Sequence, residues 1–205
     1  MKASKVKTDL ACQSVVAALE DDPFYRSISE EFAGDIAQRR RALTRYFAYS
    51  IEEGRTLGRT IHLTDPSQGV AVWLLPQPNE IRARAAERKR AFLQDTLGSR
   101  GVRNYYRMVE YMSGKSKALV SDRAWYLSII AVDPSLQGRG LGQQLLAPTL
   151  EEADAKGAIS YLETFGPRSV PFYERLGFRT VARFEEPTTA AEYAIMVRNP
   201  HTPHA

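Results

Sequence analysis

Three glycines alternate with other residues in the turn 137–142, at Gly138, Gly140 and Gly142. The run 127–132 before this turn is short, apolar and rich in branched side chains, which predicts a buried strand. The segment 143–156 after the turn repeats its apolar residues at helical intervals. A glycine turn that leads into a helix directs backbone N–H groups to one point, where the helix dipole also favours negative charge. The spacing therefore predicts a turn that binds a phosphate group.

Two common phosphate-binding motifs do not fit this turn. A Walker A loop needs Gly-Lys-Ser or Gly-Lys-Thr after its glycines, and the turn contains neither. A dinucleotide fingerprint needs G-x-G-x-x-G, but its last position falls on Gln143 when counted from Gly138 and on Leu145 when counted from Gly140. The pattern that does fit is Q-x-x-G-x-G, beginning at Gln137.

A second motif follows a predicted strand at 161–164. It reads Pro-Phe-Tyr-Glu-Arg-Leu-Gly-Phe over residues 171–178. Pro171 suits the first turn of a helix, and Gly177 suits a left-handed cap at its end. In this order and at this spacing, the two motifs resemble the acyl-CoA pyrophosphate loop and the last motif of the GNAT superfamily of N-acetyltransferases. Within that superfamily, residues 69–73 and 162–178 resemble the puromycin N-acetyltransferase branch.

The resemblance implies an α/β (α+β) fold, with a mixed, mostly antiparallel central sheet and helices on both faces. A chain of 205 residues suits one domain, which we expect to span 1–205 with its cofactor-binding core at about 125–178. A helical insertion at about 79–119 precedes the cofactor strand. We expect this insertion to form a wall or lid of the acceptor pocket.

Apolar spacing predicts the remaining elements. Helices are expected over 9–20, over 35–53 with an end near Gly54, over 79–97 with Asn79 as the cap, and over 102–112. Strands are expected over 59–64, 70–75, 179–184 and 192–198. The family's usual first strand should precede the first helix, but only the polar segment 2–7 is available for it. We therefore expect that strand to be short or absent.

Composition excludes several other classes of protein. A lone cysteine, Cys12, gives no disulfide framework, and three histidines, two of them in a polar tail, argue against a zinc site. No apolar run reaches membrane-spanning length and the start lacks a secretory apolar region, so we expect no membrane association and a cytoplasmic location. The net charge is +4, with basic clusters at 39–41 and 82–90 that fit solvated helix faces better than a nucleic-acid footprint.

The resemblance implies acetyl-CoA as a co-substrate and no metal. The residues expected to hold it come from the cofactor strand, the glycine turn and the last motif: Ile130, Val132, Gln137, Gly138, Arg139, Gly140, Leu141, Gly142, Gln143, Ser169, Phe172 and Tyr173. An irregularity near Ile130 would free its backbone N–H for the thioester carbonyl. Many relatives carry an Asn before the last helix, and Ser169 is a weak substitute for it here.

Amide formation needs an unprotonated amine, a polarised thioester carbonyl and a stabilised leaving thiolate. Tyr173 is the candidate for the last role, because a phenol with a pKa near ~10 stays protonated at neutral pH and can donate a hydrogen bond to the sulfur. Glu163 is the candidate base, directly or through water. The competing interpretations are that Tyr173 only packs beside Phe172 and that Glu163 is a surface or salt-bridged carboxylate.

The acceptor is expected to contact aromatic residues of the first half of the chain and of the cofactor strand, namely Phe24, Tyr25, Trp73 and Tyr126. Asp21, Asp22 and Glu30 flank the first two of these and could recognise a cationic amine. Exposed charge explains the three carboxylates equally well, and core packing explains Trp73.

The sequence therefore predicts an N-acetyltransferase that transfers an acetyl group from acetyl-CoA to a primary amine of a small molecule, by direct attack in a ternary complex. An aminonucleoside-type antibiotic is one candidate acceptor. The alternatives are a protein or peptide N-acetyltransferase and a non-catalytic acyl-CoA-binding module. The expected assembly is a monomer or a homodimer, with no nucleic-acid partner.

Overall fold

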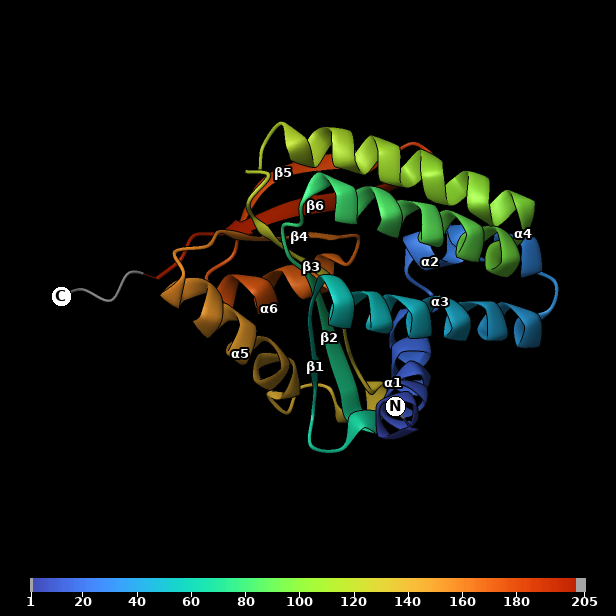
Figure 1. Cartoon of the computed structure of the whole chain (residues 1–205), viewed down its shortest axis with the longest axis horizontal. Coiled ribbons are helices and arrows are strands. Elements are labelled where there is room, and N and C mark those ends of the chain that lie inside the picture. The colour runs from blue at the N-terminus through green and yellow to red at the C-terminus, as the bar shows by residue number, and fades with distance from the viewer. Residues whose placement is uncertain (1, 202–205) are drawn as a thin grey trace.

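The computed structural model describes residues 2–201, which form one six-stranded sheet with helices on both faces (Figure 1). The strands run in the order β1-β2-β3-β4-β6-β5, and only the β3–β4 pair is parallel. Their bounds are β1 Gly58–His62, β2 Gly69–Leu74, β3 Trp125–Val132, β4 Ser160–Thr164, β5 Arg179–Glu186 and β6 Ala191–Arg198. The predicted mixed, mostly antiparallel sheet is confirmed.

The helices form two layers, one on each side of the sheet (Figure 1). The first layer holds α1 Lys2–Leu19, α2 Pro23–Ile28, α3 Ile36–Leu57 and α4 Asn79–Lys117, whose buried residues include Phe47, Leu97 and Met108. The second holds α5 Leu141–Ala155 and α6 Val170–Arg175, packed on Trp73 and Phe178. No helix of the described residues is long and apolar enough to cross a membrane.

Several helix boundaries differ from the prediction, and three of them have a structural reason. Residues 2–7, the only candidates for a first strand, begin α1, so the described sheet has no strand before this helix. The helix α3 continues to Leu57 because Gly54 packs inside it: a Cβ there would lie 2.6 Å from Val72 Cγ1. The predicted cap Asn79 is instead the first residue of α4; Pro78 holds the cap position and makes no side-chain cap bond.

The insertion consists of the two helices predicted at 79–97 and 102–112, joined at a kink in α4. Gly98 adopts a left-handed backbone with a φ of 67° at the kink, a conformation that glycine reaches without strain. The side chain of Glu31 accepts a hydrogen bond from the backbone N–H of Arg100 at 2.9 Å. It thus satisfies one of the N–H groups left free where the second helix of α4 begins after the kink.

One extra residue in β3 shapes the middle of the sheet. Val72 and Trp73 of β2 pair with Ile129 and Leu127, so Ser128 has no opposite residue. Such a bulge moves the following side chains to the opposite faces. Leu127 therefore packs in the layer of α5, whereas Ile129 packs in the layer of α1 and α3.

The parallel β3–β4 pairing ends at the same place. The last paired residues are Leu127 and Leu162, and β3 continues for five residues beyond this point with only β2 beside it. The side of β3 that faces away from β2 is thus an open strand edge within the sheet.

Close packing of the insertion can be tested at Gly101 in α4. A Cβ at Gly101 would lie 2.2 Å from the carbonyl oxygen of Ile28, so Gly101→Ala must push α2 and α4 apart. We expect the free energy of unfolding to fall by about 1–3 kcal/mol in denaturant titrations, the usual cost of overpacking. Gly114→Ala in the same helix is the control, because nothing lies within 4 Å of its added Cβ. It should leave stability unchanged or raise it by about 0.5–1 kcal/mol; equal effects at the two sites would contradict the packing.

Candidate active site

Two cavities meet beside the open edge of β3. The first, here called the turn cavity, has a volume of about 600 Å³ and extends from the glycine turn to α6. The second, the aromatic cavity, has a volume of about 550 Å³ and lies between the sheet, α2 and α4. Five residues line both cavities: Ala18, Leu19, Ile130, Ser169 and Tyr173. The two cavities are therefore continuous at these residues.

The glycine turn has the backbone expected of a phosphate-binding site. Gly138 and Gly140 have φ values of 78° and 79°, and nothing lies within 4 Å of a Cβ added to either. Gly140 is the N-cap of α5 and offers no side chain to the first N–H groups of the helix. These groups can therefore donate to an anion in the turn cavity.

Most of the predicted cofactor residues line the turn cavity. They are Ile130, Val132, Gln137, Gly138, Gly140, Leu141, Gly142, Gln143, Ser169, Phe172 and Tyr173. Arg139 does not line it. Two arginines that the sequence analysis did not select, Arg168 and Arg175, do line it and bring positive charge to its wall. The sequence could have indicated these two arginines by their positions, because Arg175 lies within the second motif and Arg168 lies three residues before it.

Gly142 joins the two motifs by packing. A Cβ at Gly142 would lie 3.0 Å from Cζ of the Phe172 ring, so the ring rests against the start of α5. The start of α6 and the glycine turn are thus held beside one another although they are far apart in the sequence.

The predicted irregularity in the cofactor strand lies at Ser128, two positions before Ile130. Ile130 itself pairs with Ala71 of β2, and β4 no longer runs beside it. Its side chain lines both cavities. Backbone groups of β3 past the bulge that face away from β2 are available to an extended ligand, in the way an edge strand accepts another strand.

Tyr173 lies at the junction of the two cavities and is buried. Its ring contacts Phe172 at 5.1 Å and Phe178 at 6.0 Å between centroids. Burial, with a smaller contribution from the charge of Asp22, raises the pKa of Tyr173 above its usual value. The hydroxyl is therefore a proton-bearing donor at neutral pH.

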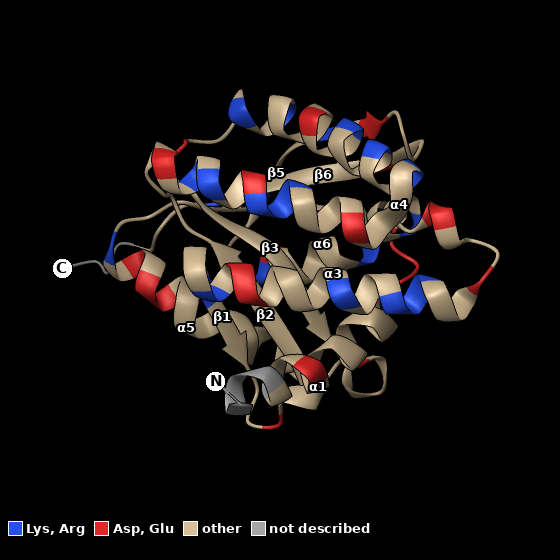
Figure 2. Ribbon diagram, turned by 45° about the vertical axis from the view of Figure 1, so that its right-hand side comes forward, with Lys and Arg blue, Asp and Glu red and all other residues tan. Residues whose placement is uncertain are grey.

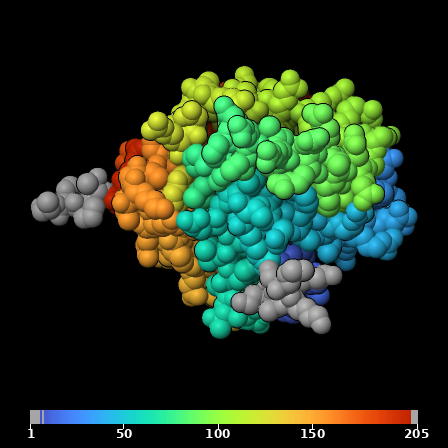
Figure 3. All heavy atoms as spheres, viewed as in Figure 1, coloured from blue at the N-terminus to red at the C-terminus, as the bar shows by residue number. Residues whose placement is uncertain are grey.

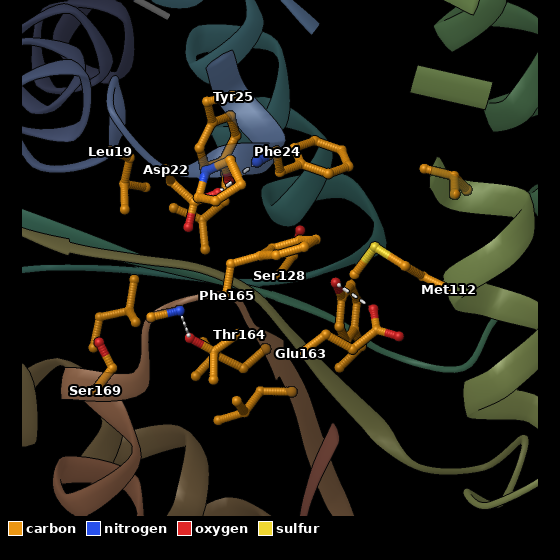
Figure 4. A pocket seen from close by; sticks show the side chains of 18 of the residues that line it. Leu19, Asp22, Phe24, Tyr25, Met112, Ser128, Glu163, Thr164, Phe165 and Ser169 are labelled. Atoms are coloured by element: carbon orange, nitrogen blue, oxygen red, sulfur yellow. Dashed lines mark hydrogen bonds between the residues drawn. The ribbon is translucent and has the colours of Figure 1, made fainter. Parts of the chain in front are cut away.

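Aromatic side chains line much of the second cavity (Figure 4). They are the predicted Phe24, Tyr25 and Tyr126 together with Tyr46, Tyr105, Tyr161 and Phe165. Trp73, also predicted to meet the acceptor, lines neither cavity; it is fully buried against α5, where an indole fills core volume.

Glu163 of β4 lies in the aromatic cavity beside Tyr126, whose hydroxyl donates a hydrogen bond to Oε2 at 3.2 Å (Figure 4). The rings of Tyr126 and Tyr161 stack on one another beside Glu163, with 4.8 Å between their centroids. The second oxygen, Oε1, is buried without a hydrogen-bond partner among the described residues. Burial raises the pKa of Glu163 to about 7, and the hydroxyls of Tyr126 and Ser116 lower it by less.

Asp22 is the second carboxyl group of this cavity. It caps α2 by accepting the backbone N–H of Phe24 at 2.9 Å. Burial raises its pKa to about 6, against the opposing effect of the backbone N–H groups of Phe24 and Tyr25. The neighbouring Asp21 and Glu30 are exposed and do not line the cavity.

Lys89 of the insertion also lines the aromatic cavity, but its charge is paired. Its Nζ lies 2.7 Å from Oε2 of Glu53 on α3, and the rings of Tyr49 and Tyr105 lie within 6.0 Å of it. Further along α4, Met112 and Ser116 complete this wall of the cavity.

A family model supports the assignment that these motifs suggested. Residues 70–178 match the Acetyltransferase (GNAT) family. The chain belongs to this family. The matched segment runs from β2 through the glycine turn to the end of the second motif.

Curated relatives match over short stretches. Glucosamine 6-phosphate N-acetyltransferase of Trypanosoma brucei brucei is 38% identical over 58 residues, which cover 28% of this chain and 40% of that protein. An acetyltransferase of Agrobacterium fabrum is 34% identical over 61 residues, which cover 29% of this chain and 44% of that protein. The chain thus spans less than half the length of these two relatives.

Solved structures resemble the chain over its whole length. A histone acetyltransferase HPA2 and related acetyltransferase from Corynebacterium glutamicum has a TM-score of 0.62 and 23% identity, covering 100% of this chain and 96% of that one. Mosquito arylalkylamine N-acetyltransferase like 5b has a TM-score of 0.56 and 16% identity, covering 95% of each chain. These likenesses show a shared fold.

The burial of Glu163 predicts a particular dependence of stability on pH. Its pKa is about 7 in the folded protein and 4.5 in an unperturbed carboxyl, so the folded state holds this proton more tightly. The contribution of Glu163 to the free energy of unfolding therefore falls as pH rises from about 4.5 to about 7. Glu163→Gln removes this titration. Its free energy of unfolding, relative to that of wild type, should therefore increase as pH rises through this window, and the difference should reach up to ~3 kcal/mol at pH values above the window.

Urea unfolding of both proteins at several pH values measures this difference. Glu87→Gln, which changes an exposed carboxyl group of α4, is the control and should show no such trend. A constant difference between Glu163→Gln and wild type would mean that Glu163 titrates as an exposed carboxyl group.

Proposed function

We propose that this protein is an acetyl-CoA-dependent N-acetyltransferase that acetylates a primary amine of a small molecule in a ternary complex. The observation that carries the proposal is the junction of the turn cavity with the aromatic cavity at Tyr173, Ile130 and Ser169. One cavity has the features of a site for an anionic nucleotide, and the other has carboxyl groups and aromatic walls suited to an amine.

The turn cavity fits acetyl-CoA as a co-substrate. Backbone N–H groups at the start of α5 suit the pyrophosphate, and Arg168 and Arg175 add positive charge on the same cavity. The open edge of β3 suits an extended pantetheine arm, with Ser169 as a further polar contact. In this arrangement the thioester lies at the junction, beside Ile130 and Tyr173.

The proposed reaction uses residues of the junction and of the aromatic cavity. The amine nitrogen attacks the thioester carbonyl carbon, a C–N bond forms, and the C–S bond breaks. Tyr173 donates its hydroxyl hydrogen bond to the leaving sulfur, and a carboxylate accepts the proton that the amine loses.

Two carboxyl groups can accept that proton. Glu163 was predicted from the sequence, and its pKa of about 7 suits a base at neutral pH. Asp22 has a pKa of about 6 and lies beside Leu19, which lines both cavities (Figure 4). Because this position is near the junction, we assign Asp22 to the amine that is acetylated.

Several observations support a small acceptor over a peptide. The α1–α2 connection and α4 line the aromatic cavity from different sides, and a curated relative is a glucosamine 6-phosphate N-acetyltransferase. An aminonucleoside antibiotic, the acceptor that the puromycin branch implies, is one candidate of this class. Tyr173 at the junction argues against a non-catalytic acyl-CoA-binding module.

The reaction itself is tested by incubating the protein with acetyl-CoA and a panel of small amines, antibiotics and peptides, and measuring released thiol. Small amines should release thiol and gain the mass of an acetyl group. Release with peptides alone would favour the protein acetyltransferase, and binding of acetyl-CoA without release would favour the binding module.

The role of Tyr173 predicts a specific kinetic defect in Tyr173→Phe. Only a hydroxyl is lost, so fold and acetyl-CoA affinity should be retained while kcat falls by ~10²-fold, within the range for positioned acid–base groups. The fall in kcat should exceed any rise in the KM for acetyl-CoA. Tyr106→Phe, at an exposed position of α4, is the control. Wild-type turnover in Tyr173→Phe would leave Tyr173 a packing role only.

The glycine turn can be tested with a residue that tolerates its backbone. Gly140→Asn keeps the left-handed conformation, which Asn adopts more readily than most residues, and adds a side chain over the turn. We expect calorimetry to show that the affinity for acetyl-CoA falls about tenfold or more, because the added side chain obstructs the N–H groups at the start of α5. Gly157→Asn has a similar φ of 62° and an equally open site, but lies at the other end of α5. Equal affinities of the two variants would move the pyrophosphate elsewhere.

A further inference from the structure

The aromatic cavity contains two carboxyl groups where the proposed reaction needs one proton acceptor. Asp22 comes from the connection between α1 and α2, and Glu163 comes from β4. Figure 4 shows them on opposite sides of Phe165, with Asp22 near Leu19 and Glu163 near Met112. They therefore mark two ends of one cavity.

The two ends differ in their relation to the junction. Leu19, near Asp22, lines both cavities, and the charge of Asp22 acts on Tyr173. Glu163 instead has Tyr126, Tyr161 and the α4 residue Ser116 around it. Asp22 thus belongs to the end where the acetyl group is transferred, and Glu163 belongs to the end toward the insertion.

Neither carboxyl group forms an ion pair with a basic residue among those that the structure describes. Lys89 is the single basic side chain of the described residues that lines the cavity, and Glu53 already neutralises it at 2.7 Å. The Oε1 atom of Glu163 is buried and accepts no hydrogen bond within bonding geometry in the described part of the chain; the hydroxyl of the nearby Ser116 donates to the carbonyl oxygen of Ser113 instead. An ionised carboxylate in such a place is costly unless a cation is brought to it.

The walls at both ends favour a cation as well. Phe24 and Tyr25 adjoin Asp22 (Figure 4). The stacked rings of Tyr126 and Tyr161 adjoin Glu163, to which the Tyr126 hydroxyl donates. Aromatic faces attract ammonium groups, most strongly where water is excluded. A ligand anion finds no free basic partner among the described residues that line this cavity, so a carboxylated or phosphorylated acceptor fits it poorly.

We infer that the acceptor is a diamine or a similar dication: one amine is acetylated at the Asp22–Tyr173 end, and a second cationic group is held by Glu163 beside Tyr126. This inference rests on the proposed N-acetyltransferase activity for the transfer step. The recognition of two charges rests on the cavity itself and can be measured without turnover.

The test compares α,ω-diaminoalkanes of increasing length with n-alkylamines and ω-amino alcohols of the same lengths. With wild-type protein, the best diamine should exceed its matched monoamine in kcat/KM for thiol release by about ten- to a hundredfold, the usual value of a charge-assisted hydrogen bond. In Glu163→Gln this ratio should fall toward unity, mainly through the KM for the diamine. Glu87→Gln, which changes an exposed carboxyl group, should keep the wild-type ratio.

Asp22→Asn distinguishes the two ends. It should lower kcat for diamines and monoamines alike, because it removes the carboxylate at the transfer end. If Asp22→Asn abolished the diamine preference while Glu163→Gln lowered kcat for both amines, the assignment of the ends would be overturned. Equal kcat/KM for diamines, monoamines and amino alcohols in wild type would overturn the second cation site while leaving the acetyltransferase activity intact.

Calorimetry with the same amines in the presence of CoA separates the two proposals. If diamines bind more tightly than monoamines and Glu163→Gln loses this difference, the dication site is supported. This holds even if no amine releases thiol from acetyl-CoA. In that case the acetyltransferase proposal fails and the dication site stands. Equal binding of diamines and monoamines overturns the dication site.

Discussion

The separation of β3 from β4 after Leu127 and Leu162 is the constraint on which the rest of the structure depends. Parallel strands satisfy one another's backbone groups only while they run side by side, so β3 keeps an open edge from Ser128 onward. The bulge at Ser128 turns the following side chains over at the same point. A ligand can therefore enter the middle of the sheet, where two layers of helices already supply walls.

The two cavities at this opening have opposite electrostatic character. The turn cavity has helix N–H groups and two arginines, whereas the aromatic cavity has two carboxyl groups and one lysine that is already paired. Figure 2 shows acidic and basic residues interspersed along α3 and α4, so the separation of charge lies at the two cavities and not along these helices. Such an arrangement would direct a polyanion and a cation to different sides of Tyr173.

The helical insertion determines what the aromatic cavity can hold. Its atoms, green to yellow-green, cover the top of the molecule in the view of Figure 3. Its residues Lys89, Tyr105 and Met112 line the cavity. The insertion is held by close backbone contact at Gly101 and by the kink at Gly98. Changes in α4 should therefore alter acceptor choice without altering the turn cavity, since no residue of α4 lines that cavity.

The sequence by itself determined the mixed sheet, the strand–turn–helix at 127–156 and the short helix that ends at Gly177, because these depend on local apolar spacing and on residues with unusual backbone freedom. It also selected Tyr173, Glu163 and the glycine turn as site residues, and these line the two cavities. Only the tertiary structure decided that Trp73 is core, that Arg168 and Arg175 rather than Arg139 line the turn cavity, and that Asp22 lines the same cavity as Tyr173. It also decided that residues 2–7 extend a helix and that α3 passes Gly54. These outcomes depend on which elements approach one another, and burial, shared cavities and pKa shifts arise from contacts between segments that are far apart in the sequence.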